Sequence, residues 1–137
     1  MKAHVSSILL GVADLDRSKK FYVEGLGWKI RDDYGVSVFF ESEGGSLVGF
    51  YGREGLAEQM GTSPEGSGFS GFALTYVVRS EARVGEIAAE AEKAGATILK
   101  PAGALPWGGY GATFADPDGY IWSLGYSARG TDQPYAE

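Results

Sequence analysis

The chain carries few side chains whose type and spacing suit chemistry. His4 is its one histidine and it has no cysteine, which excludes disulfides, thiolate catalysis and zinc–thiolate sites. Glu41 with Glu43, and Asp116 with Asp118, are paired carboxylates, but each pair lies at or beside a turn sequence. A general acid needs burial to raise its pKa, and one histidine cannot make a divalent metal site that takes about three ligands. We therefore predict no catalytic residue among these groups.

The second half of the sequence repeats the first. Phenylalanine meets phenylalanine, the turn glycine meets the turn glycine, and a strand leucine meets an isoleucine. The aligned segments are residues 40–49 on 114–123, 7–12 on 73–78, and 26–27 on 94–95. Such a repeat predicts two copies of one structural unit.

Hydrophobic patterning predicts the same order of elements in both halves: a strand, a helix and three strands. In the first half we expect strands at residues 5–12, 28–31, 36–41 and 46–51, with a helix from Asp14 or Asp16 to about Glu24. In the second half we expect strands at residues 72–78, 97–100, 112–115 and 120–126, and a helix that Ser80 caps and Gly95 ends. The connecting segments are one or two helical turns at 54–60, a linker at 61–71, a loop at 101–111 and a loose polar tail after Ser127.

These elements predict an α+β fold with two βαβββ modules, at about residues 4–60 and 70–127. Each half alone would bury too little apolar surface, so we expect one domain over residues 1–137. Each helix has a single apolar stripe and must cover one sheet face. The modules are therefore expected to pair into a curved half-barrel sheet, with the helices on the outer face and a cleft on the inner face.

Charge and hydropathy limit the partners. The 12 basic and 18 acidic residues give a net charge of −6, which disfavours nucleic acid and anionic membranes. No apolar run has membrane-spanning length, and the first residues lack the layout of a signal peptide. We expect a cytoplasmic protein.

The motifs together resemble the vicinal oxygen chelate superfamily, which includes glyoxalase I, extradiol dioxygenases and bleomycin-resistance proteins. The residues that carry the resemblance are 10–15 with Ser18, 21–22 and 26–27 in the first half, and 114–122 in the second. It extends over about residues 5–126. The resemblance implies the half-barrel fold and, for the bleomycin-resistance type, a homodimer.

Metal enzymes of this superfamily place one His, Gln or Glu ligand at each of four repeat-related strand positions. Carried over to this chain, these positions fall on Ser7, Gly49, Ala73 and Ser123. None of the four is a ligand of that kind. We therefore predict no metal and no cofactor.

Without metal, the cleft is predicted to bind an organic ligand. Period-two alternation from the four positions predicts the lining, and Trp107 and Tyr110 are added from the glycine-flanked loop, where ligand contact and a plug or dimer interface are equal alternatives. The predicted ligand-binding residues are Ser7, Leu9, Leu47, Gly49, Tyr51, Ala73, Thr75, Trp107, Tyr110, Ile121 and Ser123. Trp122 and Leu124 are expected to point to the helices, and Trp28 to pack in the core.

The leading hypothesis is metal-independent sequestration of a small hydrophobic compound, flat or glycosylated, by a homodimer related to antibiotic-resistance proteins. Sequestration needs affinity alone, without an acid or base. One alternative is a lyase, isomerase or dioxygenase with atypical or no metal, for which Glu41, Tyr51, Tyr76 and Tyr110 are the acid–base candidates. Another is an interaction module with a vestigial cleft.

Overall fold

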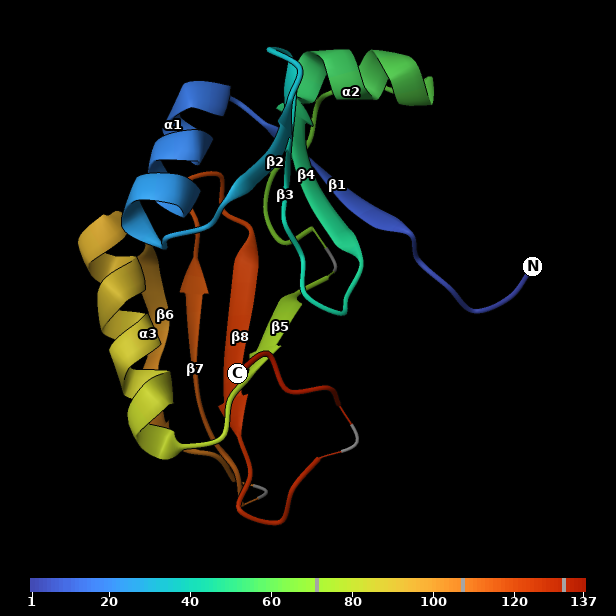
Figure 1. Cartoon of the computed structure of the whole chain (residues 1–137). Helices are drawn as coiled ribbons and strands as arrows, with labels where there is room; N and C mark the ends of the chain where they lie inside the picture. The colour runs from blue at the N-terminus through green and yellow to red at the C-terminus, as the bar shows by residue number, and fades with distance from the viewer. Residues whose placement is uncertain (71, 107, 132) are drawn as a thin grey trace. The chain divides into compact units, whose positions relative to one another are not determined.

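The structure is a computed structural model that describes residues 1–70, 72–106, 108–131 and 133–137. It consists of two compact units, unit 1 (Met1–Gly68) and unit 2 (Phe69–Glu137). Each unit contains a four-stranded mixed sheet with a helix along one side (Figure 1). The predicted α+β class and the two βαβββ modules are confirmed.

The two units share the order strand, helix and three strands. Unit 1 contains β1 (Ser7–Val12), α1 (Leu15–Lys19), a π-helix (Lys20–Gly25), β2 (Ile30–Asp33), β3 (Ser37–Phe40), β4 (Leu47–Gly52) and α2 (Arg53–Met60). Unit 2 contains β5 (Leu74–Val77), α3 (Glu81–Ala94), β6 (Thr97–Ala104), β7 (Tyr110–Ala115) and β8 (Ile121–Tyr126). The sheet orders are β1-β4-β3-β2 and β5-β8-β7-β6, and in each sheet the first two strands are parallel. Among the described residues, no helix is both long and apolar enough to span a membrane.

Strand pairing reproduces the sequence repeat residue for residue. Leu9 pairs with Gly49 in unit 1, and their repeat partners Thr75 and Ser123 pair in unit 2. The repeat in the amino-acid sequence is therefore also a repeat of the strand pairing register.

The repeat extends to an irregularity in the edge strands. In β2 the pairing with β3 shifts between Ile30 and Asp32. In β6 the pairing with β7 shifts between Ile98 and Lys100, the repeat-related place. Both edge strands are thus bulged at the same point.

The predicted helix boundaries are confirmed where a side chain or a glycine sets them. Asp14 Oδ1 accepts a hydrogen bond from the Arg17 N–H at 3.1 Å, and Ser80 Oγ accepts one from the Arg83 N–H at 3.1 Å. Gly95 ends α3 at φ 115°, a left-handed conformation that favours glycine.

The sequence did not predict the π-helix. A regular helix was expected to about Glu24, but the Leu26 N–H donates to the Phe21 carbonyl, five residues earlier, at 3.0 Å. The wider turn lets the consecutive side chains Phe21 and Tyr22 both be buried. Burial of two adjacent aromatic rings therefore overrides the regular helical register.

Aromatic rings dominate the core of unit 1. Tyr22 lies 4.7 Å from Phe50 and 4.6 Å from Trp28, measured between ring centroids, and Phe40 lies 5.6 Å from Phe50. These separations are those of favourable aromatic pairs. Trp28 packs against this core as predicted.

In unit 2, α3 covers the sheet with the predicted stripe. Its buried residues are Val84, Ile87, Ala88 and Ala91. Trp122 and Leu124 are buried in the sheet, and the Trp122 ring stacks on Phe114 at an interplanar angle of 16°. The prediction that Trp122 and Leu124 belong to the core is confirmed.

The predicted loop at residues 101–111 is wrong at both ends. β6 continues to Ala104 and β7 begins at Tyr110, so the two strands pair through Gly103 and Gly111. Pro101 suggested a strand end, but β6 is an edge strand, where a residue without an N–H is tolerated. The tail after Ser127, which was predicted to be loose, contacts β5 and α3 through Ala136 and Glu137.

Candidate ligand-binding site

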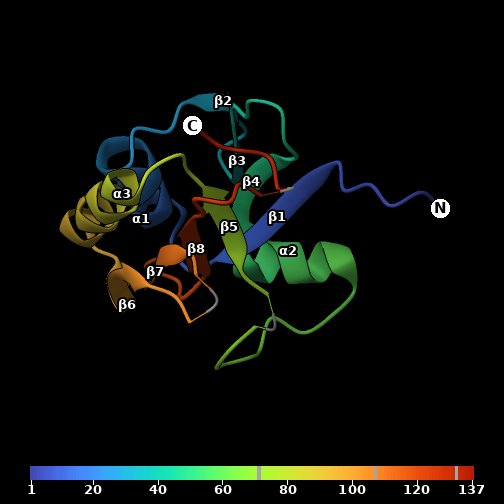
Figure 2. The same ribbon diagram turned by 90° about the horizontal axis from the view of Figure 1, so that it is seen from below.

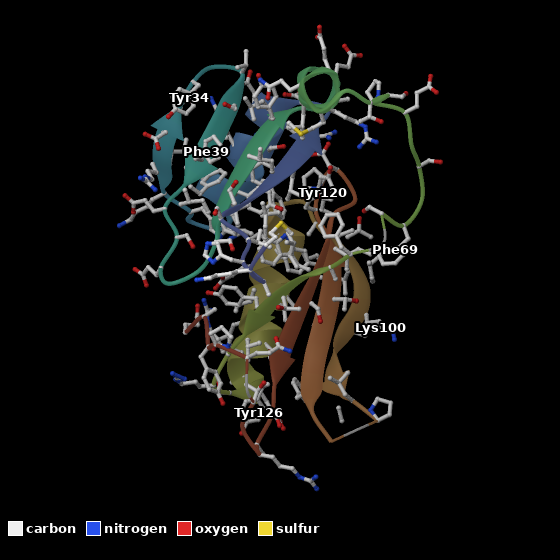
Figure 3. The ribbon with its side chains drawn as sticks, turned by 90° about the vertical axis from the view of Figure 1, so that its right-hand side faces the viewer. Tyr34, Phe39, Phe69, Lys100, Tyr120 and Tyr126 are labelled. Carbon is white, nitrogen blue, oxygen red and sulfur yellow. The ribbon has the colours of Figure 1, made fainter. Side chains whose placement is uncertain are left out.

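Five of the predicted ligand-binding residues share one side of the unit 1 sheet. Directly paired residues project to the same face, and Ser7 pairs with Leu47 as Leu9 pairs with Gly49. Tyr51 follows Gly49 by two residues and lies on the same side. We call this side, which faces away from α1, the open face of unit 1. Figure 3 looks at the side turned away from α1 and α3.

A row of four residues crosses the open face of unit 1 at one register. We call it the stacking row, and its members on β1, β4, β3 and β2 are Leu9, Gly49, Phe39 and Asp32. The Phe39 ring lies over Gly49: a Cβ added at Gly49 would come within 2.8 Å of two ring carbons. Real side chains do not tolerate that distance, so the glycine is required for this ring position.

The Phe39 ring has a second aromatic neighbour at the rim. Tyr34 meets it edge to face, with centroids 6.2 Å apart and planes at 80°. Tyr34 is 65% exposed, and Leu9, on the other side of Gly49, is 37% exposed. The open face therefore offers solvent an aromatic surface with an aliphatic border.

Sequence reasoning missed Phe39 and Tyr34. The lining was extrapolated along the strands that carry the ligand positions, and β3 was not among them. The antiparallel pairing of β3 with β4 puts Phe39 opposite Gly49, so a cross-strand alignment of the predicted hairpin was the signal that could have found it.

Tyr51 is held by α2. Its hydroxyl accepts a hydrogen bond from Gln59 Nε2 at 3.0 Å, and its ring lies against Gly55, where an added Cβ would be 3.0 Å away. α2 follows β4 directly and contacts β1 and β4 (Figure 2). Tyr51 thus forms the end of the open face beside α2.

Unit 2 carries a row at the repeat-related register with a different chemistry. We call it the hydroxyl row, and its members on β5, β8, β7 and β6 are Thr75, Ser123, Thr113 and Lys100. It lies on the sheet side opposite the buried Trp122 and Leu124. Three adjacent strands therefore each present a hydroxyl. Lys100, which is labelled in Figure 3, ends the row.

The other predicted residues of unit 2 fall in different places. Ile121 lies on β8 two residues before Ser123, on the same side, and Ala73 is exposed just before β5. Tyr110 was predicted in a loop, but it begins β7 and by alternation shares the side of Ala112 and Phe114, away from the hydroxyl row. Trp107 lies outside the described residues.

The donor set does not fit the metal centre that the family resemblance implies. Ser7, Ala73 and Ser123 bring no nitrogen or carboxylate, and Gly49 is covered by the Phe39 ring. Among the described residues, no three His, Cys, Asp or Glu side chains come together in a group that could hold a metal ion. His4 is exposed.

Tyr76, one of the acid–base candidates, and the turn carboxylate Asp116 both make structural hydrogen bonds. Tyr76 donates to Glu137, and burial, followed by that hydrogen bond, raises its pKa to about 12, which makes it a poor base at neutral pH. Asp116 Oδ1 accepts the N–H groups of Asp118 and Tyr120, each at 2.9 Å. As predicted, that carboxylate shapes its turn.

Two four-stranded sheets of identical order and matching register define a duplicated βαβββ protein. A sequence model of the Glyoxalase/Bleomycin resistance protein/Dioxygenase superfamily matches residues 4–124. The chain belongs to this superfamily.

Solved structures agree with this assignment. A glyoxalase-related enzyme from Fulvimarina pelagi is 31% identical, with 98% of this chain and 100% of that chain covered and a TM-score of 0.85. A family enzyme from Burkholderia phytofirmans is 23% identical (88% and 96% covered, TM-score 0.78), and a lactoylglutathione lyase from Agrobacterium tumefaciens is 19% identical (92% and 95% covered, TM-score 0.68). The last two share the fold. A search of curated proteins gave no match.

Proposed function

We propose that this chain binds and sequesters a small organic compound with a flat hydrophobic part, without using a metal. The observation that carries the proposal is the Phe39 ring over Gly49, the position to which the family resemblance carries one of the four metal ligands. A glycine there has no side chain that could bind a metal, and it leaves the space that the Phe39 ring occupies. The position then offers a surface for stacking in place of a Lewis acid.

The stacking row favours a flat ligand. Aromatic faces pair well with conjugated rings, and Tyr34 fixes the Phe39 ring edge to face. An aromatic side chain held in this way loses little conformational freedom when a ligand binds. A planar hydrophobic group is therefore the expected binding partner of this row.

The hydroxyl row of unit 2, considered by itself, suits the polar groups of a ligand. Thr75, Thr113 and Ser123 each offer one donor and two acceptor sites, and Lys100 offers a cation. A sugar or another polyhydroxyl group would match hydroxyls spaced one strand apart, about 4.8 Å.

The test is a binding screen of flat and glycosylated aromatic natural products by equilibrium dialysis and intrinsic fluorescence. For a compound that binds the wild-type chain, Phe39→Ala is expected to weaken affinity by about 2- to 10-fold, the factor that corresponds to one aromatic pair. Phe69→Ala is the matched control, because Phe69 is also exposed, at 71%, but lies outside both rows.

Two results would count against the proposal. One is a screen in which no compound binds saturably. The other is an equal loss of affinity in Phe39→Ala and Phe69→Ala, which would mean that the stacking row does not carry the binding.

An enzymatic function is the second candidate, since the chain is 31% identical to a protein described as a glyoxalase-related enzyme. It requires a donor set or an acid–base group different from those described above. Stoichiometric zinc, nickel, manganese or iron by elemental analysis of the untagged protein, or turnover of a glutathione adduct, would favour this candidate over sequestration.

A further inference from the structure

The end of the described chain lies along the outer edge of β5. The Ala136 N–H donates to the Val77 carbonyl at 2.8 Å, while the next residue, Val78, donates its N–H to Gly125 of β8 at 2.9 Å. The Val77 carbonyl therefore points away from β8, toward the open edge of the sheet. We call residues 133–137 the strap. Its backbone bond to an edge strand is the contact that an added strand makes.

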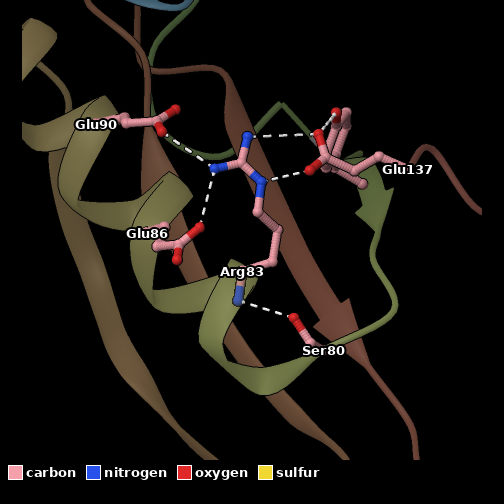
Figure 4. A network of polar contacts seen from close by, with 6 residues as sticks. Ser80, Arg83, Glu86, Glu90 and Glu137 are labelled. Atoms are coloured by element: carbon pink, nitrogen blue, oxygen red, sulfur yellow. Dashed lines mark hydrogen bonds and ion pairs between the residues drawn. The ribbon is translucent and has the colours of Figure 1, made fainter.

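Arg83 and Tyr76, which we call the clamp, bind the Glu137 carboxylate at the end of the strap (Figure 4). Glu137 Oε1 accepts a hydrogen bond from Arg83 Nε, and Glu137 Oε2 accepts from Arg83 Nη2 at 3.4 Å and from the Tyr76 hydroxyl at 2.7 Å. The guanidinium thus grips both carboxylate oxygens, the geometry in which arginine recognises carboxylates best.

The clamp is held in position by groups other than the strap. Glu86 and Glu90, on α3, accept hydrogen bonds from Arg83 Nη1 at 3.3 and 3.1 Å. These bonds direct Nε and Nη2 toward Glu137 (Figure 4). The guanidinium is thus shared between two carboxylates of its own helix and the carboxylate of the strap.

A second cationic contact lies further along the strap. The Arg79 guanidinium carbon sits 4.0 Å from the centre of the Tyr135 ring. Together with Ala136 and Glu137, this gives three consecutive residues with a contact each: an aromatic ring, a backbone N–H and a carboxylate.

These contacts hold the strap only weakly. The Arg83 and Glu137 side chains are 31% and 39% exposed, and ion pairs with that access to water contribute little. A single backbone bond joins the strap to β5. Opening the strap would release the Val77 carbonyl on the edge strand and the Arg83 side of the guanidinium–carboxylate pair.

We propose that the outer edge of β5, with Arg83 and Tyr76, is a binding site for an extended peptide segment that carries a carboxylate, and that the strap is its exchangeable resident occupant. The ligand class follows from the occupant: an aromatic residue, a spacer and an acidic residue in an extended run. The proposal does not depend on the proposed function.

The test uses the full chain with Glu137→Gln, which weakens the strap's hold and leaves the clamp intact. The probe is a peptide amide with the sequence of residues 133–137, added up to the concentration that saturates the signal. Two-dimensional NMR follows the Arg83 Nε–H and the amides of Val77 and Val78. We expect the variant to shift these resonances and the peptide to return them toward their wild-type positions.

Two controls make this result specific. A peptide with Gln in place of Glu is expected to have little effect, and Arg83→Lys added to Glu137→Gln is expected to weaken peptide binding by tenfold or more, since lysine cannot grip both oxygens. Equal shifts with both peptides, or no shift with either, would overturn the proposal.

The pH dependence of strap docking gives an independent readout. Arg83, followed by Tyr76, lowers the pKa of Glu137, so the contact is present above the ordinary carboxyl pKa and is lost as the pH falls through the lowered value. The pKa of Tyr76 is raised to about 12, so its contact is present below the ordinary tyrosine pKa of about 10 and is lost as the pH rises through 12. In Glu137→Gln the Tyr76 titration should move toward the ordinary value, and the acidic peptide should reverse that change. An unmoved titration in Glu137→Gln would also contradict the proposal.

Discussion

At the scale of single residues, the chemistry of the open face depends on one glycine and one ring. Gly49 has no Cβ, and the Phe39 ring lies where a Cβ would be. Any larger residue at position 49 must displace the ring, so a metal-binding side chain and the Phe39 platform exclude each other in this conformation.

A double-mutant cycle tests this exclusion. Gly49→Ala should reduce the free energy of unfolding by about 1–3 kcal/mol, the usual cost of overpacking. In the Phe39→Ala background the same change should cost much less, because the ring is gone. Urea denaturation of the four proteins measures the coupling. Equal costs in both backgrounds would mean that Phe39 does not rest on Gly49.

Site residues were predictable from the sequence only along strands. The repeat located Gly49 and Ser123 at matching positions, because duplication preserves register. Phe39 was not found, since its place over Gly49 arises from pairing across a hairpin. Tyr110 was misassigned because Pro101 and the glycines around it resemble a loop, while the edge position of β6 lets the strand continue.

At the scale of elements, α3 shows which local signals determine a boundary. A hydroxyl cap begins it and a left-handed glycine ends it, and both were readable in the sequence. The π-helix after α1 has no comparable local signal. It results from the burial of Phe21 and Tyr22 together, which depends on the tertiary core.

Two glycines of the α3 region give a matched pair of substitutions. Gly85 lies inside the helix with open space around an added Cβ, so Gly85→Ala should stabilise the protein by about 0.5–1 kcal/mol. Gly95 has φ 115°, so Gly95→Ala should destabilise it by about 1 kcal/mol. Thermal or urea unfolding of the two variants measures whether each substitution raises or lowers the free energy of unfolding. Stabilisation by Gly95→Ala would contradict the left-handed helix end.

At the scale of the whole molecule, large apolar side chains remain exposed in both units. Val36 is 62% exposed, Phe69 71% and Leu99 48%. Apolar surface of this kind commonly marks contacts with other molecules. The family resemblance adds the expectation of a homodimer.

Sedimentation equilibrium tests that expectation. We expect a mass twice the 14.5 kDa of the chain, with dissociation on dilution if the contact is weak. Charge substitutions such as Val36→Glu and Leu99→Glu, made one at a time, should shift the equilibrium toward the monomer for whichever residue lies in the contact. A monomer at every concentration would contradict the prediction.

The fold as a whole was predictable because the sequence contains it twice. Each half of the sequence predicts the same order of elements independently. The predicted length of β6 was too short, but this affected only the second half. The strap was not predictable, since it depends on one arginine and one tyrosine that lie far from it in the chain.

The bulge that β2 and β6 share also says something about ancestry. An irregular pairing between Ile30 and Asp32, matched between Ile98 and Lys100, is harder to acquire twice than to inherit once. Duplication of one module that already carried this irregularity would account for both copies. The stacking and hydroxyl rows would then be two versions of one scaffold, and each half would be a natural reference for the other.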